Sequence, residues 1–522
     1  MDRNSAIEIL GQDRVWDVLI IGGGASGLGA AVESASRGYS TLLLEQDDFA
    51  KATSSRSTKL IHGGVRYLAQ GNVRLVMEAL RERGILKRNA AHLVKDQPFV
   101  IPCYHWWCIP FYTAGLTLYD FLAGKLSVGR SVPLSRKRTM KALPNAKPAG
   151  LKGGIRYFDC QFDDSRLAIN LCQTLFEQGG YALNYMPVTG ILSEGGTVSG
   201  AVAEDLESNR KYRIRARSVI NATGVFVDRI IKMAEPEARD VVKPSQGIHL
   251  VVHRSFLDGG EALMIPRTSD GRVLFAIPWH NRVVIGTTDV EKLEAELEPR
   301  AKEEEVEYIL ETAGRFMDHA PGRKDVLSVF TGLRPLAAPA GHGKKTKEIS
   351  RGHRIMVTPS GLVTLTGGKW TTYRKMGEDV VNEAARRSGL PVRPSVTRSL
   401  RIHGSRKTVD HRIPGYWYGS DLEQVRSLIR EDPFNGEILS EELQISRAMV
   451  IWAVRAEMAR TVEDFLARRT RALQLDAAGS ARLAPLVAPI MAGELGHDAD
   501  WEKMQVDAYT SLARNYMIKP TP

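Results

Sequence analysis

The sequence predicts an α/β chain (α+β overall) with a Rossmann-like domain near the N-terminus, a second domain with a mixed sheet, and a helical C-terminal domain. Three observations support this prediction. A buried strand, a glycine-rich turn, a helix and a second strand follow one another within residues 16–45. Strand patterns separated by turn signals recur from 188 to 288. After residue 400, apolar residues recur mainly at helical spacing.

The bulk composition is that of a globular protein. The chain has 522 residues, enough for two or three domains, with 43% hydrophobic and 25% charged residues. It has no run of about 18 apolar residues, and residues 1–14 lack the apolar centre of a signal peptide, so we expect a cytoplasmic location. Its cysteines are too few and too irregular for a disulfide framework or a zinc site, so we expect reduced thiols and no metal. They are Cys103, Cys108, Cys160 and Cys172.

The net charge indicates what kind of partner the protein has. A formal charge of +11 fits an anionic partner: a phosphorylated substrate, an anionic membrane surface or nucleic acid. No basic segment interleaved with aromatic residues stands out, so nucleic acid is the weakest of the three and none is expected.

The first strand and turn carry a dinucleotide-binding pattern. Residues 18–21 are aliphatic throughout, and Gly22, Gly24 and Gly27 then fit G-x-G-x-x-G at the start of a helix. The glycines allow a tight turn, close approach to a pyrophosphate and close packing of helix on strand. Glu45 ends the next strand, where an acid can accept hydrogen bonds from an unphosphorylated ribose, which favours FAD or NAD over NADP.

A polar, hydroxyl-rich loop follows at residues 47–68. Its residues 53–58 could bond a diphosphate or the edge of an isoalloxazine ring. His62 precedes two glycines and could approach a planar cofactor closely. On its own, His62 would more often be a structural histidine, and Arg66 with Tyr67 an ordinary surface pair.

This loop closely resembles the FAD-dependent, quinone-linked glycerol-3-phosphate dehydrogenases, and the resemblance covers most of the chain. Residues 157–167 are similar to the family motif Y-x-D-x-Q-x-D-D-x-R-L, and 367–374 to G-G-K-x-T-T-Y-R. Residues 278–279 and 286–289 resemble the family's substrate-domain motifs, and 457–471 resemble its helical C-terminal module. The resemblance implies an FAD-binding domain of the glutathione-reductase or D-amino-acid-oxidase type.

Two further segments favour FAD. Residues 219–224 resemble the strand and turn that return to the nucleotide in such folds, and no second G-x-G-x-x-G follows a later strand. A separate NAD(P)H domain is therefore not expected. Gly368 and Lys369 stand at a predicted helix start, whose free N–H groups suit the negative charge that reduced flavin carries near N1 and O2.

Charged residues give two further hypotheses. Asp163 and Asp164 could be a paired acid/base site, but a helix is predicted at 167–177, so we interpret them as helix caps. Arginines at 334 and 351 would each more often be surface residues. With Arg66 and Lys369 they form a candidate anion pocket, because guanidinium groups suit phosphate.

The aromatic stretch at residues 99–126 has two interpretations. A buried bend beside the substrate is favoured, because Pro102, Pro110 and glycines interrupt an interfacial helix. The alternative is a membrane-contact surface, since Trp and Tyr suit the lipid headgroup region. Basic residues that would complement an anionic leaflet follow it: Lys125, Arg130, Arg136, Lys137, Arg138 and Lys141.

The remaining elements set the predicted domain boundaries. Helices are expected at 73–86, at 303–317 and after the segment 367–373 to about 386. A hairpin is expected at 188–203, and strands at 244–252, 273–277 and 283–288. Helices at 440–458 and 461–473 are expected in the last domain, and a weaker one at 483–495, which contains two prolines. The predicted domains are FAD-binding (1–90, 150–243 and 350–392), substrate (91–149 and 244–349) and helical (393–522).

The resemblance implies oxidation of sn-glycerol 3-phosphate to dihydroxyacetone phosphate, with hydride transfer from C2 to flavin N5. By the same resemblance His62 is the leading base, and Arg334 and Lys369 stabilise or orient the C2 oxygen. The substrate phosphate is expected at Arg66, Tyr67, Arg334 and Arg351. The expected FAD contacts are Gly22, Gly24, Gly27, Glu45, Thr53, Ser54, Ser55, Thr58, Lys59, Leu60, Ala222, Gly224, Gly368, Lys369 and Thr371.

The expected partners are a membrane quinone, an anionic membrane surface and a second copy of the chain in a homodimer. The protein would then lie on the inner face of the cell membrane as a peripheral, monotopic protein. Two alternatives stay open. An oxidase of the same group would pass electrons to oxygen and release peroxide. An FAD-containing RNA-binding or RNA-modifying protein would show salt-sensitive RNA binding.

Overall fold

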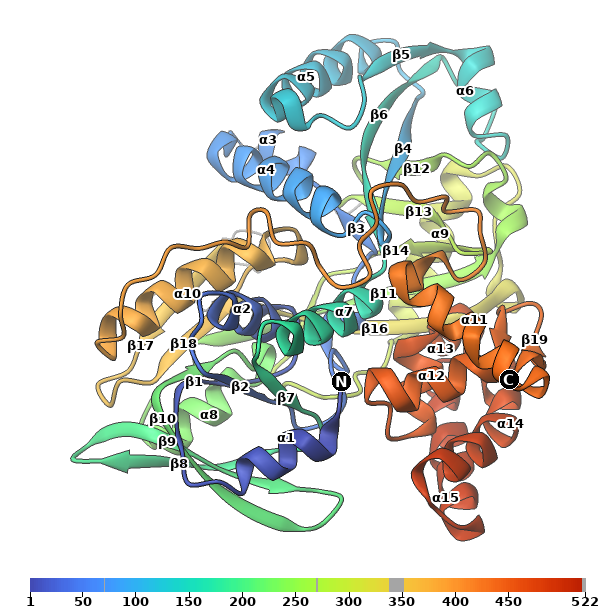
Figure 1. Cartoon of the computed structure of the whole chain (residues 1–522). Coiled ribbons are helices and arrows are strands. Elements are labelled where there is room, and N and C mark those ends of the chain that lie inside the picture. The colour runs from blue at the N-terminus through green and yellow to red at the C-terminus, as the bar shows by residue number, and fades with distance from the viewer. Residues whose placement is uncertain (70, 269–270, 338–351, 519–522) are drawn as a thin grey trace.

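The structure is a computed structural model that describes residues 1–69, 71–268, 271–337 and 352–518. Two sheets form its centre, and helices cover both (Figure 1). The first sheet has the strand order β17-β18-β10-β1-β2-β7, and β8 and β9 extend it from β10. Its strands are β1 (Val15–Ile21), β2 (Thr41–Leu44), β7 (Tyr181–Leu183), β8 (Val188–Glu194), β9 (Thr197–Asp205), β10 (Arg210–Asn221), β17 (His353–Val357) and β18 (Val363–Gly367).

The first sheet is parallel at its centre and covered on both faces. β1 pairs in parallel with β2 and β10, which makes a buried, aliphatic strand the middle of the layer. Val18 and Ile20 face the layer of α2 (Ala25–Ser36), α7 (Asp164–Glu177) and α10 (Tyr373–Arg387). Leu19 and Ile21 face α1 (Arg3–Leu10), α8 (Val227–Ala234) and the β8–β9 extension. This is the predicted α/β arrangement.

The second sheet is mixed, as predicted. Its order is β15-β11-β14-β13-β12-β4-β6-β3, with β16 beside β11 and β5 beside β6. Its strands are β3 (Leu60–Ile61), β4 (Val94–Cys103), β5 (Val132–Ser135), β6 (Gly153–Phe162), β11 (Val242–His253), β12 (Ala262–Ile265), β13 (Leu274–Trp279), β14 (Arg282–Gly286), β15 (Val290–Glu291) and β16 (Val326–Ala337). The helices α6 (Arg136–Ala142) and α9 (Glu303–Phe316) pack on it.

Three helices form a layer at the far end of this sheet, labelled in the upper part of Figure 1. They are α3 (Val65–Ala69), α4 (Val73–Asn89) and α5 (Cys108–Ala123). The favoured burial of residues 99–126 holds for the strand half of the stretch, where Phe99 and Ile101 are buried. It does not hold for the turn before the helix or for the outer face of the helix, because Trp106 is 77% and Phe121 80% exposed. The prolines lie before the helix or in its first turn, so they do not interrupt it.

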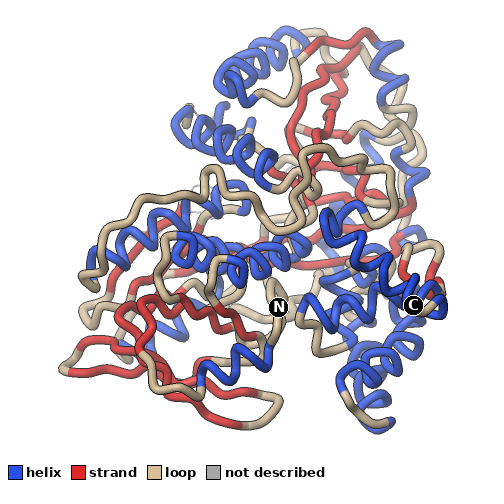
Figure 2. The backbone as a smooth tube through the Cα atoms, viewed as in Figure 1, coloured by secondary structure: helices blue, strands red, loops and turns tan. Residues whose placement is uncertain are grey.

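The C-terminal domain is mainly helical, as Figure 2 shows by its blue tube. Its helices are α11 (Leu422–Glu431), α12 (Arg447–Glu457), α13 (Ala472–Leu475), α14 (Ala477–Leu495) and α15 (Ala499–Arg514), and β19 (Ile438–Ser440) pairs with β20 (Ile445–Ser446). Pro485 and Pro489 lie inside α14, whose buried face offsets the lost backbone bonds. The predicted helix at 461–473 is wrong as one helix, because a π-helical turn is followed by Arg471 in the left-handed region.

Buried ion pairs join this domain to the first one. Arg166 donates two hydrogen bonds of 2.7 Å to Glu457. Asp163 caps α7 as predicted, accepting from the backbone of Arg166. Asp164 is the first residue of α7 and accepts a 2.8 Å hydrogen bond from Ser165 N. Its carboxylate also lies 2.8 Å from Lys59 Nζ, and both side chains are fully buried. Removing one partner of such a pair would leave a buried charge uncompensated. No helix in the described residues is long and apolar enough to cross a membrane.

Candidate active site

The glycine turn after β1 makes one wall of a deep cavity. Gly22 has φ +108°, a backbone conformation that residues with a side chain rarely adopt. A Cβ on Gly27 would lie 1.8 Å from the carbonyl oxygen of Gly22, so only glycine lets α2 start this close to β1. A Cβ on Gly24 would lie 2.9 Å from Ser54 Oγ. The turn therefore brings backbone groups, without side chains, to the cavity at the start of α2.

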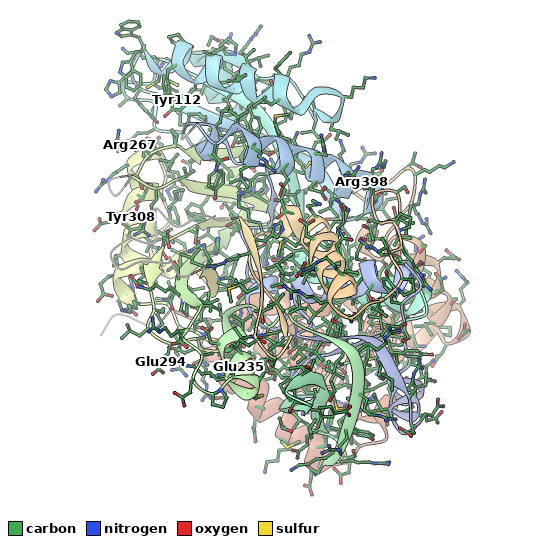
Figure 3. The ribbon with its side chains drawn as sticks, turned by 90° about the vertical axis from the view of Figure 1, so that its left-hand side faces the viewer. Tyr112, Glu235, Arg267, Glu294, Tyr308 and Arg398 are labelled. Atoms are coloured by element: carbon green, nitrogen blue, oxygen red, sulfur yellow. The ribbon has the colours of Figure 1, made fainter. Side chains whose placement is uncertain are left out.

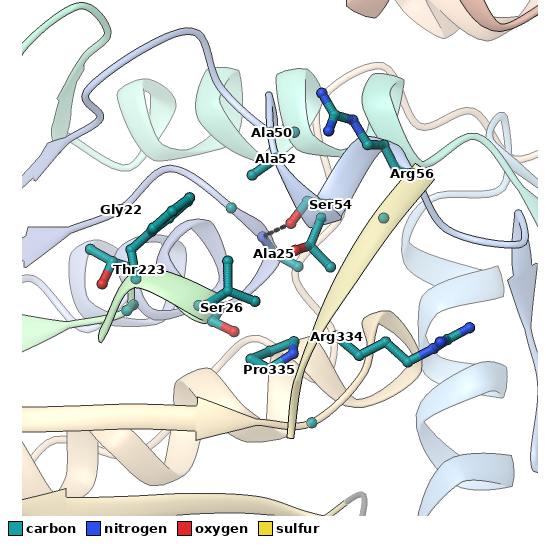
Figure 4. A pocket seen from close by; sticks show the side chains of 18 of the residues that line it. Gly22, Ala25, Ser26, Ala50, Ala52, Ser54, Arg56, Thr223, Arg334 and Pro335 are labelled. Atoms are coloured by element: carbon teal, nitrogen blue, oxygen red, sulfur yellow. Dashed lines mark hydrogen bonds between the residues drawn. The ribbon is translucent and has the colours of Figure 1, made fainter. Parts of the chain in front are cut away.

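The cavity has a volume of about 440 Å³ and runs past the ends of β1 and β2 (Figure 4). Ser54 Oγ accepts a hydrogen bond from Ala25 N at 2.9 Å, which ties the hydroxyl-rich loop to the helix start. Most predicted cofactor residues line this cavity: Gly22, Gly24, Glu45, Thr53, Ser54, Thr58, Leu60, Ala222, Gly224, Gly368, Lys369 and Thr371. Residues from five separate parts of the sequence thus meet around one elongated space.

Glu45 lies at the end of β2, on the cavity wall. Its carboxylate accepts hydrogen bonds from Gly23 N at 2.6 Å and Asp47 N at 3.0 Å. Its removal from water raises its pKa to about 7, despite these two donors. The carboxylate is therefore held in place and faces the part of the cavity nearest the turn.

Two predicted cofactor residues lie behind the cavity wall. Lys59 Nζ contacts Asp164, Ser55 O at 2.6 Å and Gln474 Oε1 at 2.9 Å. Gln474 also donates to Ser55 O at 2.7 Å. The Lys59 side chain and the Ser55 carbonyl group therefore support the loop from behind the cavity wall. Direct contact of Ser55 and Lys59 with a cofactor stays a prediction.

A smaller cavity of about 160 Å³ continues from the first. The residues that line both are Thr58, Leu60, His62, Tyr67 and Arg334. Phe99, Tyr157 and Phe275 give the smaller cavity an apolar wall, and Arg272 and Asp289 add charge. We call the two cavities together the chamber. Its far end combines charged and apolar groups in a volume that suits a small polar substrate.

Arg334 lies inside β16 rather than at a strand end. Its Nη2 donates to Thr287 Oγ1 and Thr288 O, both at 3.1 Å. Asp289 Oδ1 is 3.7 Å from its Nη1. A Cβ on Gly247 would lie 2.3 Å from Nη2, so that glycine makes room for the guanidinium group. These contacts fix the guanidinium group where the two cavities meet.

Lys369 and Tyr67 approach the same place from another side. The Lys369 ammonium group lies 4.0 Å from the centre of the Tyr67 ring. Lys369 follows two glycines with positive φ and precedes a 3-10 turn and α10. Thr371 Oγ1 lies 3.5 Å from the carbonyl oxygen of His62. The Gly-Gly-Lys segment therefore meets the His62–Tyr67 segment. The anion pocket that would also include Arg66 and Arg351 stays a prediction.

His249 is a candidate site residue that the sequence hypothesis missed. It lines the larger cavity, is 2% exposed, and shares a 2.9 Å hydrogen bond between its Nε2 and Thr58 Oγ1. Burial, and then the nearby Arg334 charge, lower its pKa well below the ordinary value, so its imidazole is neutral. The available signal was a lone histidine within the buried strand pattern of residues 248–252.

Two predicted phosphate residues cannot be placed by their side chains. Arg66 lies in α3, next to Tyr67, but the description of α3 does not extend to its side chain. Arg351 lies outside the described residues. In the described residues, no group of three or more His, Cys, Asp or Glu side chains could hold a metal ion.

Comparisons with known proteins agree with this geometry. Residues 17–374 match the family model of FAD dependent oxidoreductases, and 364–502 match the C-terminal domain of alpha-glycerophosphate oxidase. The mitochondrial glycerol-3-phosphate dehydrogenase of Bos taurus is 34% identical over 99% of this chain and 75% of that protein. The Homo sapiens protein of the same name is 35% identical over 94% and 72%.

Solved structures give the same result. The X-ray structure of the Bacillus halodurans glycerol-3-phosphate dehydrogenase complexed with FAD has a TM-score of 0.81 at 28% identity, covering 100% of this chain and 98% of that one. An FAD-bound L-alpha-glycerophosphate oxidase from Mycoplasma pneumoniae has a TM-score of 0.56 at 17% identity, over 74% and 98%, and shares the fold.

Proposed function

The chain belongs to the family of FAD-dependent glycerol-3-phosphate dehydrogenases, and we propose that it oxidises sn-glycerol 3-phosphate to dihydroxyacetone phosphate. One observation carries this proposal. A cavity with a dinucleotide-binding glycine turn at one end opens at its other end into a space lined by Arg334, His62 and Tyr67. A cofactor and a small phosphorylated alcohol therefore have adjoining places.

The larger cavity fits FAD, the cofactor of this family. Gly22, Gly24 and Gly27 leave backbone exposed where a diphosphate would lie. Thr53, Ser54, Ser57 and Thr58 line the next part of the wall. Bound FAD supplies the acceptor for the hydride that leaves C2 of the substrate. The protein supplies orientation, charge and a base.

Different residues of the chamber bind different parts of the substrate. Arg334 and Lys369 orient the C2 oxygen and stabilise the negative charge that grows on it as its proton leaves. Tyr67 holds the phosphate, together with Arg66 and Arg351. The apolar wall at Phe99 limits water around the reacting carbon.

His62 takes the proton of the C2 hydroxyl, since it lines both parts of the chamber. His249 is the second candidate base, because its imidazole is neutral and bonded to Thr58 on the cavity wall. The variants His62→Asn and His249→Asn separate the two, each compared with wild type in the rate of flavin reduction by substrate. If only His249→Asn lowers that rate, the base assignment moves to His249.

The activity is tested by anaerobic mixing of the FAD-loaded protein with sn-glycerol 3-phosphate while flavin absorbance is followed. Bleaching by this substrate, and none by glycerol, is the expected result. A flavin that stays oxidised contradicts the proposal. If RNA binds the same preparation in a salt-sensitive way, the RNA-binding alternative gains support instead.

The electron acceptor is a membrane quinone. After anaerobic reduction, a soluble quinone is expected to reoxidise the flavin much faster than dissolved oxygen does. Fast reoxidation by oxygen with release of peroxide would make the protein an oxidase.

The homodimer is a separate part of the proposal, and light scattering on the purified protein measures its mass.

The membrane-facing surface is the outer side of α5 together with the turn before it and the segment after it, which we call the α5 surface. Its exposed aromatic and aliphatic members are Trp106, Trp107, Phe111, Leu118 and Phe121. The basic residues of the following segment are also exposed: Lys125, Arg130, Arg136, Lys137, Arg138 and Lys141. Exposed apolar rings and exposed cations suit an anionic leaflet, as on the inner face of a cell membrane.

Sedimentation with vesicles containing anionic lipid tests this surface. Trp106→Ser with Phe121→Ser is expected to weaken binding strongly, whereas Leu486→Ser, an exposed position on α14, leaves it unchanged. Equal binding by all these proteins would place the membrane contact elsewhere.

A further inference from the structure

The buried face of α5 points to the chamber. Leu116, Tyr119 and Ala123 are buried on this face, and Tyr119 and Ala123 pack with Val76 and Leu80 of α4. Figure 1 shows α5 beside α3 and α4. The helix that carries the α5 surface on one side therefore contacts, on its other side, the helices around the substrate end of the chamber.

The Tyr119 hydroxyl is the polar contact of this buried face. It accepts a hydrogen bond from Gly63 N at 2.7 Å and donates to the Asp159 carboxylate, whose oxygens lie 2.9 and 3.0 Å away. Arg83 Nη1 donates to the same carboxylate at 2.6 Å. Tyr119, Asp159 and Arg83 are each at most 2% exposed. Breaking any of these bonds would leave a buried polar group without water, which makes the contacts costly to lose.

Gly63 connects this network to the chamber. It directly follows His62 and lies two residues before α3, which carries Tyr67. A Cβ at Gly63 would lie 2.5 Å from the Tyr119 hydroxyl, so the backbone and the phenol are in tight contact. Tyr67 also packs on the apolar cluster that contains Tyr119. His62 and Tyr67, which we place at the substrate, therefore lie on either side of Gly63 in the sequence. The Tyr119 hydroxyl binds the backbone N–H of Gly63.

We propose that Tyr119 is a positioning residue for substrate oxidation: its hydroxyl, held by Asp159 and Arg83, fixes Gly63 and through it His62 and Tyr67. The inference rests on the proposed function of His62 and Tyr67. Burial raises the pKa of Tyr119 well above its ordinary value, so the phenol keeps the proton that it donates to Asp159. Arg83 balances the Asp159 charge in the same network.

The test is the substitution Tyr119→Phe, which removes one oxygen and keeps the ring. The rate of anaerobic flavin reduction by sn-glycerol 3-phosphate, per bound FAD, is expected to fall about tenfold or more, since small misplacements of reacting groups have large effects. The apparent Kd of the substrate in the same titration is expected to rise, because Tyr67 is also displaced. FAD content is expected to stay as in wild type.

Tyr112→Phe is the matched control. Tyr112 lies on the same helix, is labelled in Figure 3, and has no hydrogen bond from its hydroxyl to a described residue. Its variant is expected to match wild type. Equal rates per bound FAD in Tyr119→Phe and Tyr112→Phe would overturn the proposal, and so would a loss in Tyr119→Phe that follows FAD content alone.

A second variant covers the case in which Tyr119→Phe does not fold. Asp159→Asn keeps the side-chain shape and removes the charge that holds the phenol, so the same loss of rate with FAD retained is expected. An unchanged rate in Asp159→Asn would contradict the network. Failure of the proposed function is a distinct result, because wild type itself would then not be reduced by the substrate.

Discussion

The two ends of the chamber differ in whether backbone or side chains form their walls. At the end beside β1, one wall is the backbone of a single stretch, where Gly22, Gly24 and Gly27 bring no side chain. The substrate end is made of side chains from distant segments, among them His62 and Arg334. Cofactor binding at the first end depends on the absence of side chains from the glycine turn. Substrate oxidation at the second end depends on the position of charged side chains. Substitutions at the two ends are therefore expected to fail in different ways.

Gly27→Val is expected to have the largest effect. Its side chain would start 1.8 Å from the Gly22 carbonyl, so α2 must move away from the turn. Such overpacking costs about 1–3 kcal/mol or more and disrupts the site itself. The purified protein is expected to hold almost no FAD, measured by flavin absorbance per chain. Gly115→Ala is the control, because no atom lies within 4 Å of its added carbon. Normal FAD content in Gly27→Val would contradict the steric argument.

Arg334→Ala is expected to retain FAD and lose activity. Removing a charged donor from a site of developing negative charge lowers kcat/KM by about 100-fold or more. Arg334→Lys restores part of this loss, because the charge returns without the planar fork. Arg323→Ala is the control, since Arg323 pairs with Glu303 and Glu307 outside the chamber. An Arg334→Ala enzyme within twofold of wild type would remove this residue from the mechanism.

Glu45→Gln is expected to change how stability depends on pH in the FAD-free protein. The pKa of Glu45 rises from 4.5 to about 7 on folding, so its contribution to stability is fully present below pH 4.5. It is lost as the pH rises through 7, because the carboxylate must then be charged in the cavity wall.

Between pH 5 and pH 8, wild type is expected to lose about 2 kcal/mol relative to Glu45→Gln, measured by urea unfolding. Glu194→Gln, at an exposed position on β8, controls for the change in net charge. If the free energy of unfolding depended on pH in the same way in wild type and in Glu45→Gln, the pKa of Glu45 would not be raised on folding.

Thr58→Val is expected to have the smallest effect. It removes the hydrogen bond to His249 and keeps the shape of the side chain, a loss of about 1 kcal/mol or roughly fivefold in kcat/KM. Thr189→Val, at an exposed position, is expected to be neutral in the same steady-state assay. A loss as large as that of Arg334→Ala would instead make the Thr58–His249 pair a central part of the mechanism.

The sequence by itself determined the local features of this protein. The β1–α2–β2 unit, the Asp163 cap and the Gly-Gly-Lys helix start each depend on residues close together in the chain, and the structure confirms all three as local structure. Their physical reasons are short-range: backbone sterics, orphan N–H groups and aliphatic runs.

The tertiary structure alone decided features that depend on distant partners. Asp164, in the first turn of α7, gained Lys59 as a buried partner, and the outer face of α5 stayed exposed because no other segment packs on it in the described residues. His249 joined the chamber, and Tyr119 reached Gly63, only because strands and helices far apart in sequence pack together. Burial and charge compensation between such segments are properties of the folded chain, and no short stretch of sequence carries them.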